Sequence, residues 1–169
     1  MTRCRMLFSH KITRMPYLID GHNLIGKLPD IHLDQADDEE RLIERLAAFC
    51  RAARKQVEVY FDQAAPGRAG RFRHGPVTAV FISAGGTADA AIARRVQGLG
   101  RAAQNWTVVS SDNAVQASAR AGRARVMPSE QFAGLLRSGP SGSGSTRDTK
   151  LGEDELAEWL RIFGEGPDD

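Results

Sequence analysis

Four aspartates each close or follow a short apolar run with the composition of a β-strand. They are Asp20, Asp62, Asp89 and Asp112. In an open parallel sheet the carboxyl ends of the strands lie along one edge, and ligands bind in the crevice there. If the four runs are parallel strands, their aspartates therefore meet at that edge and form an acidic site.

Carboxylates that converge repel one another and raise their own pKa values unless a cation neutralises them. The chain has no pair of cysteines and no pair of histidines at zinc spacing, so oxygen ligands and Mg²⁺ or Mn²⁺ are expected. Such an ion polarises a phosphodiester, lowers the pKa of a bound water and stabilises the leaving oxygen. The pattern therefore predicts metal-assisted hydrolysis and leaves open whether one or two ions take part.

Each aspartate also has an ordinary structural explanation. Asp112 precedes a helical stretch in Ser-Ser-Asp-Asn, which suits a helix N-cap, and Asp89 at the start of an alanine-rich helix complements the helix dipole. Asp62 could be a solvated strand end. Asp20 is the most specific, because a glycine and Asn23 follow it and a tight turn there lets backbone and amide approach a ligand. An ordinary structural role for all four aspartates, each at or after the end of a predicted strand, is less expected than such a role for any one of them.

The elements that would position these residues alternate along the chain. Five runs predict strands: Tyr17–Asp20, Val57–Phe61, Val77–Ile82, Thr107–Ser110 and Arg125–Met127. Four stretches predict helices: Asp37–Lys55, Asp89–Leu99, Ala114–Arg120 and Ser129–Leu136. Strands that alternate with helices imply crossover connections. The expected fold is a three-layer α/β/α sandwich with a central, mainly parallel sheet.

The 169 residues, with 41% hydrophobic content, suit one domain with a short appendage. We expect residues 1–14 to be a disordered leader or a mis-assigned start, with a basic nucleic-acid arm as the alternative, and residues 15–137 to form the domain. Residues 138–150 have the composition of a flexible Gly/Ser linker. Residues 151–169 predict a helix with an apolar face, which could dock on the domain, on a second copy in a homodimer or on another protein. That face carries Leu156, Trp159, Leu160 and Phe163.

Positive charge is concentrated in the body of the chain. Between Arg51 and Arg137 there are thirteen Lys or Arg residues against five Asp or Glu residues, although the whole chain carries only +2. A basic body with a few isolated acids predicts a polyanionic partner. The sequence has no apolar run long enough to cross a membrane, no secretory signal and only two cysteines. We therefore expect a cytoplasmic protein without a membrane partner.

The strings L-I-D-G-H-N-L-I, V-Y-F-D, T-A-D-A-A-I and V-V-S-S-D-N-A-V, in this order, resemble the YacP-like group of NYN domains over about residues 15–137. The W-L-x-x-F tail is similar to that of some members. The resemblance implies a PIN-like fold and a metal-dependent ribonuclease that acts on structured or ribosome-associated RNA. His22 stands where many relatives have a tyrosine. Carried over by motif, the resemblance implies Asp20, Asp89 and Asp112 as core metal-binding and catalytic acids, Asn23 as the residue that orients a ligand or water, and Asp62 as a further metal ligand or its support.

Four arginines are predicted to contact RNA phosphates, which position a nucleic acid without reading its sequence. They are Arg68, Arg71, Arg73 and Arg94. The first three lie with His74 in a glycine-rich connection that leaves the second predicted strand, which would place them at the acidic edge. Ordinary solvation is the alternative. Three further arginines fall after the fourth aspartate and are expected outside the site: Arg120, Arg123 and Arg125.

Other functions would require motifs that the sequence lacks or would use the same fold without catalysis. A Rossmann-like nucleotide module fits poorly, because no G-x-G-x-x-G follows the first strand and no P-loop occurs. An aspartyl phosphatase needs a second acid where His22 stands; this histidine is expected to be a hydrogen-bonding spacer. Asp37 and Asp38 are expected to cap a helix rather than approach the metal. The alternative from another class is a noncatalytic RNA-binding or ribosome-associated adaptor with the same fold.

Overall fold

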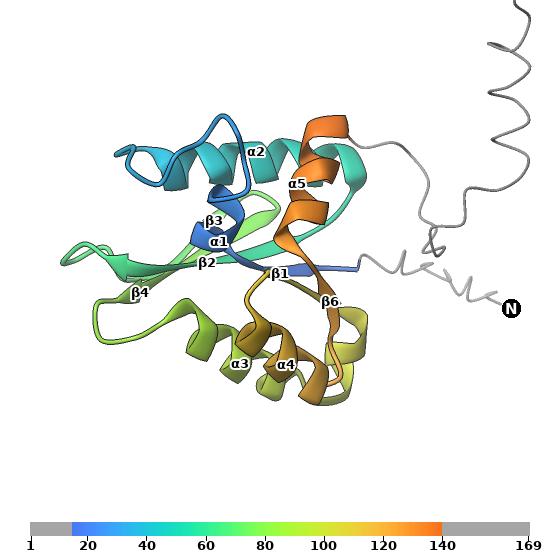
Figure 1. The fold of residues 1–169 in the computed structure, drawn as a ribbon. Coiled ribbons are helices and arrows are strands. Elements are labelled where there is room, and N and C mark those ends of the chain that lie inside the picture. Colours follow the sequence, from blue (N-terminus) through green and yellow to red (C-terminus); the bar gives the residue numbers. More distant parts are fainter. Residues whose placement is uncertain (1–14, 140–169) are drawn as a thin grey trace, which may run out of the picture.

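The computed structural model describes residues 15–139. A central sheet of six strands, in the order β3-β4-β2-β1-β5-β6, has helices on both faces (Figure 1). This arrangement confirms the predicted three-layer α/β/α sandwich. The expected leader, the expected C-terminal helix and nearly all of the expected linker lie outside the described residues.

The strands pair in parallel except at one edge. They are β1 (Tyr17–Asp20), β2 (Val57–Ala64), β3 (Gly70–His74), β4 (Val77–Ser83), β5 (Thr107–Val109) and β6 (Arg125–Met127). The only antiparallel pair among them is β3 with β4. The helices are α1 (Gly21–Ile25), α2 (Asp38–Ala53), α3 (Ala88–Leu99), the 3₁₀ helix η1 (Gly100–Asn105), α4 (Asn113–Ala121) and α5 (Ser129–Ser138). The five predicted strands and four predicted helices are all confirmed, close to their predicted bounds.

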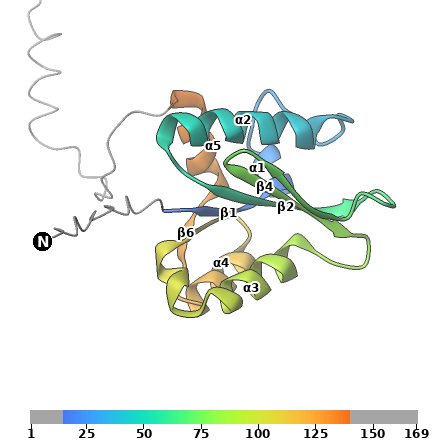
Figure 2. The ribbon, with the colours of Figure 1, turned by 180° about the vertical axis from the view of Figure 1, so that it is seen from behind.

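Alternation along β2 divides the interior into two cores. Val59 and Phe61 belong to the core beneath α1, α2 and α5, whereas Tyr60 belongs to the core beneath α3 and α4. Figure 2 shows these helices on opposite faces of the sheet. The neighbouring strand β1 is buried on both faces, since Leu18 and Ile19 are fully buried and belong one to each core. Strand β1 therefore lies at the centre of the fold and holds its last residue, Asp20, in a fixed place.

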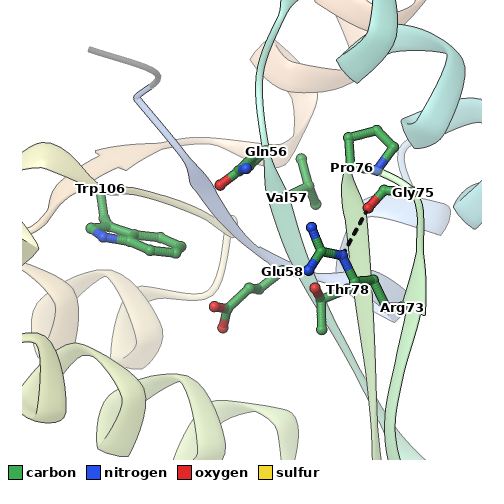
Figure 3. A pocket seen from close by; sticks show the side chains of 8 residues that line it. All are labelled: Gln56, Val57, Glu58, Arg73, Gly75, Pro76, Thr78 and Trp106. Atoms are coloured by element: carbon green, nitrogen blue, oxygen red, sulfur yellow. Dashed lines mark hydrogen bonds between the residues drawn. The ribbon is translucent and has the colours of Figure 1, made fainter. Parts of the chain in front are cut away.

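Strand β3 corrects the sequence analysis, which predicted only a glycine-rich connection between Phe61 and Val77. The segment pairs with β4, so that Arg71 lies opposite Val80 and Arg73 lies opposite Thr78. All five residues of β3 are exposed, and an exposed edge strand gives no alternation of apolar and polar residues to detect. The Arg73 Nε then donates to the Gly75 carbonyl at 3.3 Å (Figure 3). Charged side chains of this kind discourage pairing with another sheet.

Helix α2 shows why the predicted helices form where they do. Its buried residues recur at helical spacing along one face: Leu42, Ile43, Leu46, Ala47 and Cys50. Three acidic residues occupy its first turn, where they complement the helix dipole. The helix ends at Arg54, which adopts the left-handed conformation. Within residues 15–139, no helix has both the length and the apolar character of a membrane span.

Candidate active site

Asp20 is placed by the junction of β1 and α1. It is the last residue of β1 and the N-cap of α1, where its Oδ1 accepts a hydrogen bond from the Asn23 backbone N–H at 3.3 Å. The next residue must be glycine, because a Cβ at Gly21 would lie 2.3 Å from the Phe61 ring and 2.9 Å from the Tyr60 carbonyl. The Asp-Gly pair therefore follows from packing against β2. The Asp20 side chain is only 8% exposed.

The other three aspartates lie at the same edge of the sheet. Asp62 lies in β2, two residues beyond Tyr60, which pairs with Asp20. Asp89 lies in the first turn of α3, after β4, and Asp112 is the N-cap of α4, after β5. The Asp112 Oδ1 accepts from the N–H groups of Ala114 at 2.7 Å and Val115 at 3.3 Å. The capping explanation therefore holds for one oxygen of Asp112, and within the described residues the other has no hydrogen-bond partner.

The four charges act on one another. Burial, together with the charges of Asp89 and Asp62, raises the pKa of Asp20 to about 6, against the hydrogen bond from Asn23 and the nearby His22. Burial and the charges of Asp112 and Asp62 also raise the pKa of Asp89. Asp89 is thus within electrostatic reach of the other three aspartates, and Asp20 is within reach of Asp89 and Asp62. Unbalanced negative charge at one edge is the condition that a bound cation relieves.

The donor set fits a hard divalent cation. Across residues 15–139, no three His, Cys, Asp or Glu side chains are gathered closely enough to hold a metal ion in their present positions. Every available donor of the four aspartates is an oxygen, the ligand type of Mg²⁺ and Mn²⁺. Asp20 is buried without a lysine or arginine partner in the described part of the chain. An ion at this edge would supply the positive charge that the protein does not.

Asn23 offers the site hydrogen-bond donors. Its Oδ1 accepts from the Ser111 N–H at 2.9 Å and from the Ser129 hydroxyl at 2.7 Å. These two bonds tie α1 to the loop after β5 and to the start of α5, and they fix which way the amide faces. With its oxygen engaged, Asn23 has only the N–H groups of its Nδ2 left for a ligand. The role of Asn23 in orienting a ligand or water stays a prediction.

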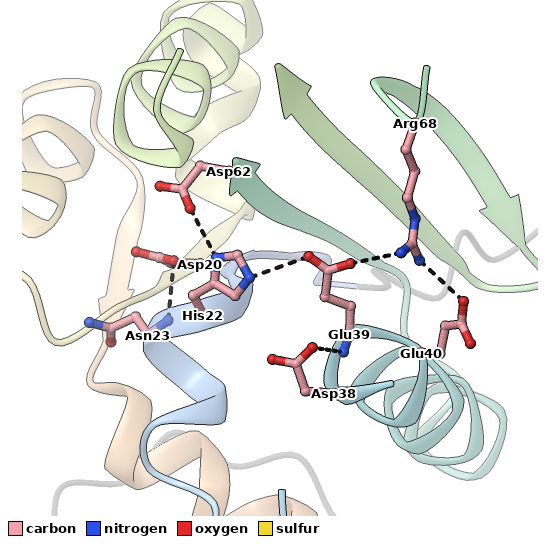
Figure 4. A network of polar contacts seen from close by, with 8 residues as sticks. All are labelled: Asp20, His22, Asn23, Asp38, Glu39, Glu40, Asp62 and Arg68. Carbon is pink, nitrogen blue, oxygen red and sulfur yellow. Dashed lines mark hydrogen bonds and ion pairs between the residues drawn. The ribbon is translucent and has the colours of Figure 1, made fainter. Parts of the chain in front are cut away.

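His22 bridges two carboxylates from different elements (Figure 4). Its Nδ1 lies 2.9 Å from the Asp62 Oδ1, and its Nε2 lies 3.3 Å from the Glu39 Oε1 on α2. Carboxylates only accept hydrogen bonds, so both contacts can be hydrogen bonds only when both ring nitrogens carry protons. The ring therefore holds Asp62 in place, as expected of a hydrogen-bonding spacer.

Glu39 is a residue that the sequence analysis missed. Its second oxygen lies 3.4 Å from the Arg68 Nη1, and the Arg68 Nη2 contacts Glu40 at 3.2 Å (Figure 4). The acidic start of α2 was attributed to helix capping alone. Asp37 does occupy the N-cap, but its side chain makes no capping hydrogen bond, and the Asp38 carboxylate accepts from the Glu39 N–H at 2.7 Å.

The four predicted RNA-binding arginines are not at one edge. Arg68 lies in the turn after β2, beside the acidic edge, with its guanidinium 4.7 Å from the Phe81 ring centroid. Strand β3 runs antiparallel to β4, so Arg71 pairs with Val80, level with Asp20, whereas Arg73 pairs with Thr78, towards the opposite edge. The expectation that Arg73 lies at the acidic edge was wrong. Arg94 is exposed on α3, with its Nε donating to the Ala90 carbonyl at 3.3 Å. Contact of these residues with RNA stays a prediction.

The sequence model of the YacP-like NYN domain matches residues 17–155. A crystal structure of Rae1 (YacP) from Bacillus subtilis is similar, with a TM-score of 0.62 and 24% identity over 72% of this chain and 73% of that chain. A mutant form of the same protein gives a TM-score of 0.59 and 24% identity over 73% and 75% of the two chains. No curated protein matches. At this identity, the likeness to Rae1 establishes a shared fold.

Proposed function

We propose that this chain, which belongs to the YacP-like NYN domain family, is a metal-dependent endoribonuclease that hydrolyses RNA phosphodiesters. The family implies an RNase-like nuclease fold. The proposal is supported by the position of four strand-end carboxylates at one edge of the sheet, where burial and the neighbouring charges raise the pKa values of Asp20 and Asp89. We further propose structured or ribosome-associated RNA as the substrate and the cytoplasm as the place of action.

Asp20, Asp89 and Asp112 would hold Mg²⁺ or Mn²⁺, with Asp62 beside them. Such an ion, when bound, polarises the phosphodiester and lowers the pKa of a water molecule so that it can attack. Asp20 is ionised, and so able to bind a cation, above a pH of about 6 in the metal-free protein. A cation lowers that threshold, because it favours the charged carboxylate. The protein's part is therefore to bring the four carboxylates to one edge of the sheet, where a bound cation would keep them charged.

Two neighbouring groups position the substrate and the acids. Asn23 directs its Nδ2 donors to a phosphate oxygen or to the attacking water, because its Oδ1 is held by Ser111 and Ser129. His22 holds the Asp62 carboxylate from one side. Arg68 lies next to this group and offers positive charge to a phosphate at the entrance of the site. No covalent nucleophile is required.

A noncatalytic RNA-binding or ribosome-associated adaptor is the second candidate. The observation that favours it is that the described residues contain no ready-made cluster of three metal ligands. The four aspartates argue against it, since an adaptor gains nothing from uncompensated carboxylates that face RNA phosphates.

The deciding experiment is cleavage of labelled total RNA in Mg²⁺ or Mn²⁺, with and without added ribosomes. It compares the wild type, Asp20→Asn and the control Glu44→Gln, which neutralises an exposed carboxylate on α2 away from the site. We expect cutting by the wild type and by Glu44→Gln, and none by Asp20→Asn or in EDTA. A wild type that binds RNA but leaves it intact in every arm supports the adaptor instead.

A further inference from the structure

A small cavity lies at the edge of the sheet opposite the four aspartates (Figure 3). It is formed by the start of β2, the turn between β3 and β4, and the residue that follows η1; the residues that matter are Gln56, Glu58, Arg73, Gly75, Thr78 and Trp106. Its volume is about 250 Å³, below the roughly 300–1,000 Å³ of sites for drug-sized ligands. It suits one group the size of a nucleobase rather than a dinucleotide cofactor.

Glu58, which lines this cavity, has both carboxylate oxygens engaged by other side chains. Its Oε2 accepts from the Tyr60 hydroxyl and the Arg95 Nε, each at 2.9 Å, and its Oε1 lies 2.8 Å from the Arg95 Nη2 and 2.9 Å from the Arg71 Nη2. Burial acts to raise the pKa of Glu58, but the hydrogen bonds from Arg95 and Tyr60 and the charges of Arg95 and Arg71 outweigh it and lower the pKa. The carboxylate has no free lone pair for a ligand and is already neutralised.

Positive charge exceeds negative charge around the cavity. Arg71 and Arg95 share the single carboxylate of Glu58, and Arg73 lines the cavity. Arg73 has no acidic partner within ion-pair distance in the part of the chain described, and its Nε contact with Gly75 holds it in place. Such an arrangement attracts an anion, and a guanidinium matches the oxygens of a phosphate.

Trp106 supplies a surface of a different kind. The ring is partly buried on one wall of the cavity, and the Arg95 guanidinium carbon lies 5.2 Å from the ring centroid. Unpaired bases stack on aromatic rings and on arginine planes. The amide of Gln56 and the hydroxyl of Thr78 lie in the same cavity and can hydrogen-bond to the edge of a base. A flat group with an attached phosphate fits all of these features.

We infer that this cavity binds one unpaired nucleotide of the RNA chain, with the base against Trp106 and the phosphate on Arg73. The choice of RNA over a free nucleotide rests on the proposed function. Asp62, at the acidic edge, lies five residues beyond Val57, at the cavity, which is about 17 Å along a strand. RNA that binds both the cavity and the acidic edge therefore extends from one end of the strands to the other. The cavity then anchors the RNA at a distance from the cleaved bond.

The test measures Trp106 fluorescence in a Trp159→Phe background, in metal-free buffer so that no RNA is cut. One arm titrates a single-stranded decaribonucleotide and another titrates nucleoside monophosphates. We expect the oligonucleotide to quench the fluorescence and Arg73→Gln to weaken its binding by about tenfold or more. Arg137→Gln, at an exposed position on α5, should leave binding unchanged. Trp106→Phe, checked for folding by thermal melting, should weaken binding of the same oligonucleotide measured by anisotropy.

The outcomes separate this inference from the nuclease proposal. If the oligonucleotide quenches the fluorescence in a manner that depends on Arg73, but the protein cuts no RNA, the nucleotide site in the cavity is supported and the nuclease proposal is refuted. The cavity site is overturned if the oligonucleotide causes no quenching and if neither Arg73→Gln nor Trp106→Phe changes cleavage or oligonucleotide binding. Monophosphates that bind as tightly as the oligonucleotide overturn the RNA assignment, because the ligand would then be a free nucleotide.

Discussion

Replacing Asp20 by asparagine should stabilise the protein at neutral pH while removing its activity. Asparagine has nearly the same shape and can still accept the hydrogen bond from the Asn23 N–H. Folding raises the pKa of Asp20 from 3.8 to about 6, a shift of about two units, and each unit corresponds to about 1.4 kcal/mol. The ionised carboxylate therefore destabilises the metal-free native state by up to about 3 kcal/mol.

The pH dependence follows from the direction of this shift. Between pH 4 and 6 the native state holds a proton on Asp20 that the unfolded chain has lost, so stability falls as the pH rises through this window. Below it both states are protonated and the effect vanishes. The Asp20→Asn variant should therefore match the wild type near pH 3.5. It should exceed the wild type by about 2–3 kcal/mol above pH 7, or about 4–12 °C in melting temperature.

The assay is thermal or urea unfolding in metal-free buffers from pH 3.5 to 8, with Glu44→Gln as the control for loss of an exposed carboxylate. Adding Mg²⁺ or Mn²⁺ at a hundred times its dissociation constant should stabilise the wild type by about 2.7 kcal/mol and Asp20→Asn much less. The reasoning is refuted if Asp20→Asn is no more stable than the wild type at pH 7.5, or if the difference between them is the same at every pH.

Four further substitutions, at three positions, test the surroundings of the two sites. Gly21→Ala places a Cβ 2.3 Å from the Phe61 ring; we expect a loss of about 1–3 kcal/mol in urea unfolding and reduced cleavage, and unchanged stability would contradict the packing. Asn23→Ala should cost about 1–3 kcal/mol, since the buried Ser129 hydroxyl loses its acceptor. Asn23→Asp retains that acceptor but lacks the Nδ2 donors. Its cleavage rate should therefore fall about a hundredfold, with a smaller change in melting temperature than for Asn23→Ala. Equal cleavage rates for Asn23→Asp and the wild type would exclude a donor role. Glu58→Gln should lower the free energy of unfolding by about 1–3 kcal/mol. This is less than for a fully buried ion pair, because Arg71 and Arg95 are partly in water. An unchanged free energy of unfolding would show that the contacts of Glu58 with these arginines add no stability.

The sequence predicted the elements with buried faces. Strands β1 and β2 and helix α2 carry apolar residues at strand or helix spacing, because each packs against a core. Strand β3 could not be predicted in the same way. All five of its residues are exposed, and its pairing with β4 depends on a turn whose geometry appears only in three dimensions. The five-residue helix α1 was missed because it begins directly at the end of β1, without an apolar period of its own.

The site was predicted in part for the same reason. Strand ends locate Asp20 and Asp112, because parallel strands place their carboxyl ends together. Glu39 could not be located, since an acid in the first turn of a helix already has an ordinary explanation and its contact with His22 joins distant segments. Glu58 did leave a signal, namely a charge within the apolar run V-E-V-Y-F. A buried carboxylate requires a partner, and Arg95 supplies it.

The position of β1 in the sheet also governs when the acidic edge can form during synthesis. Residues 17–20 emerge first, yet they pair with β5, and the Asn23 amide is tied to partners 88 and 106 residues later in the chain. Contacts between such distant segments form late in folding. A nascent chain that has not yet reached Ser129 lacks the bond that orients Asn23. The complete candidate site can therefore assemble only after most of the chain has been translated.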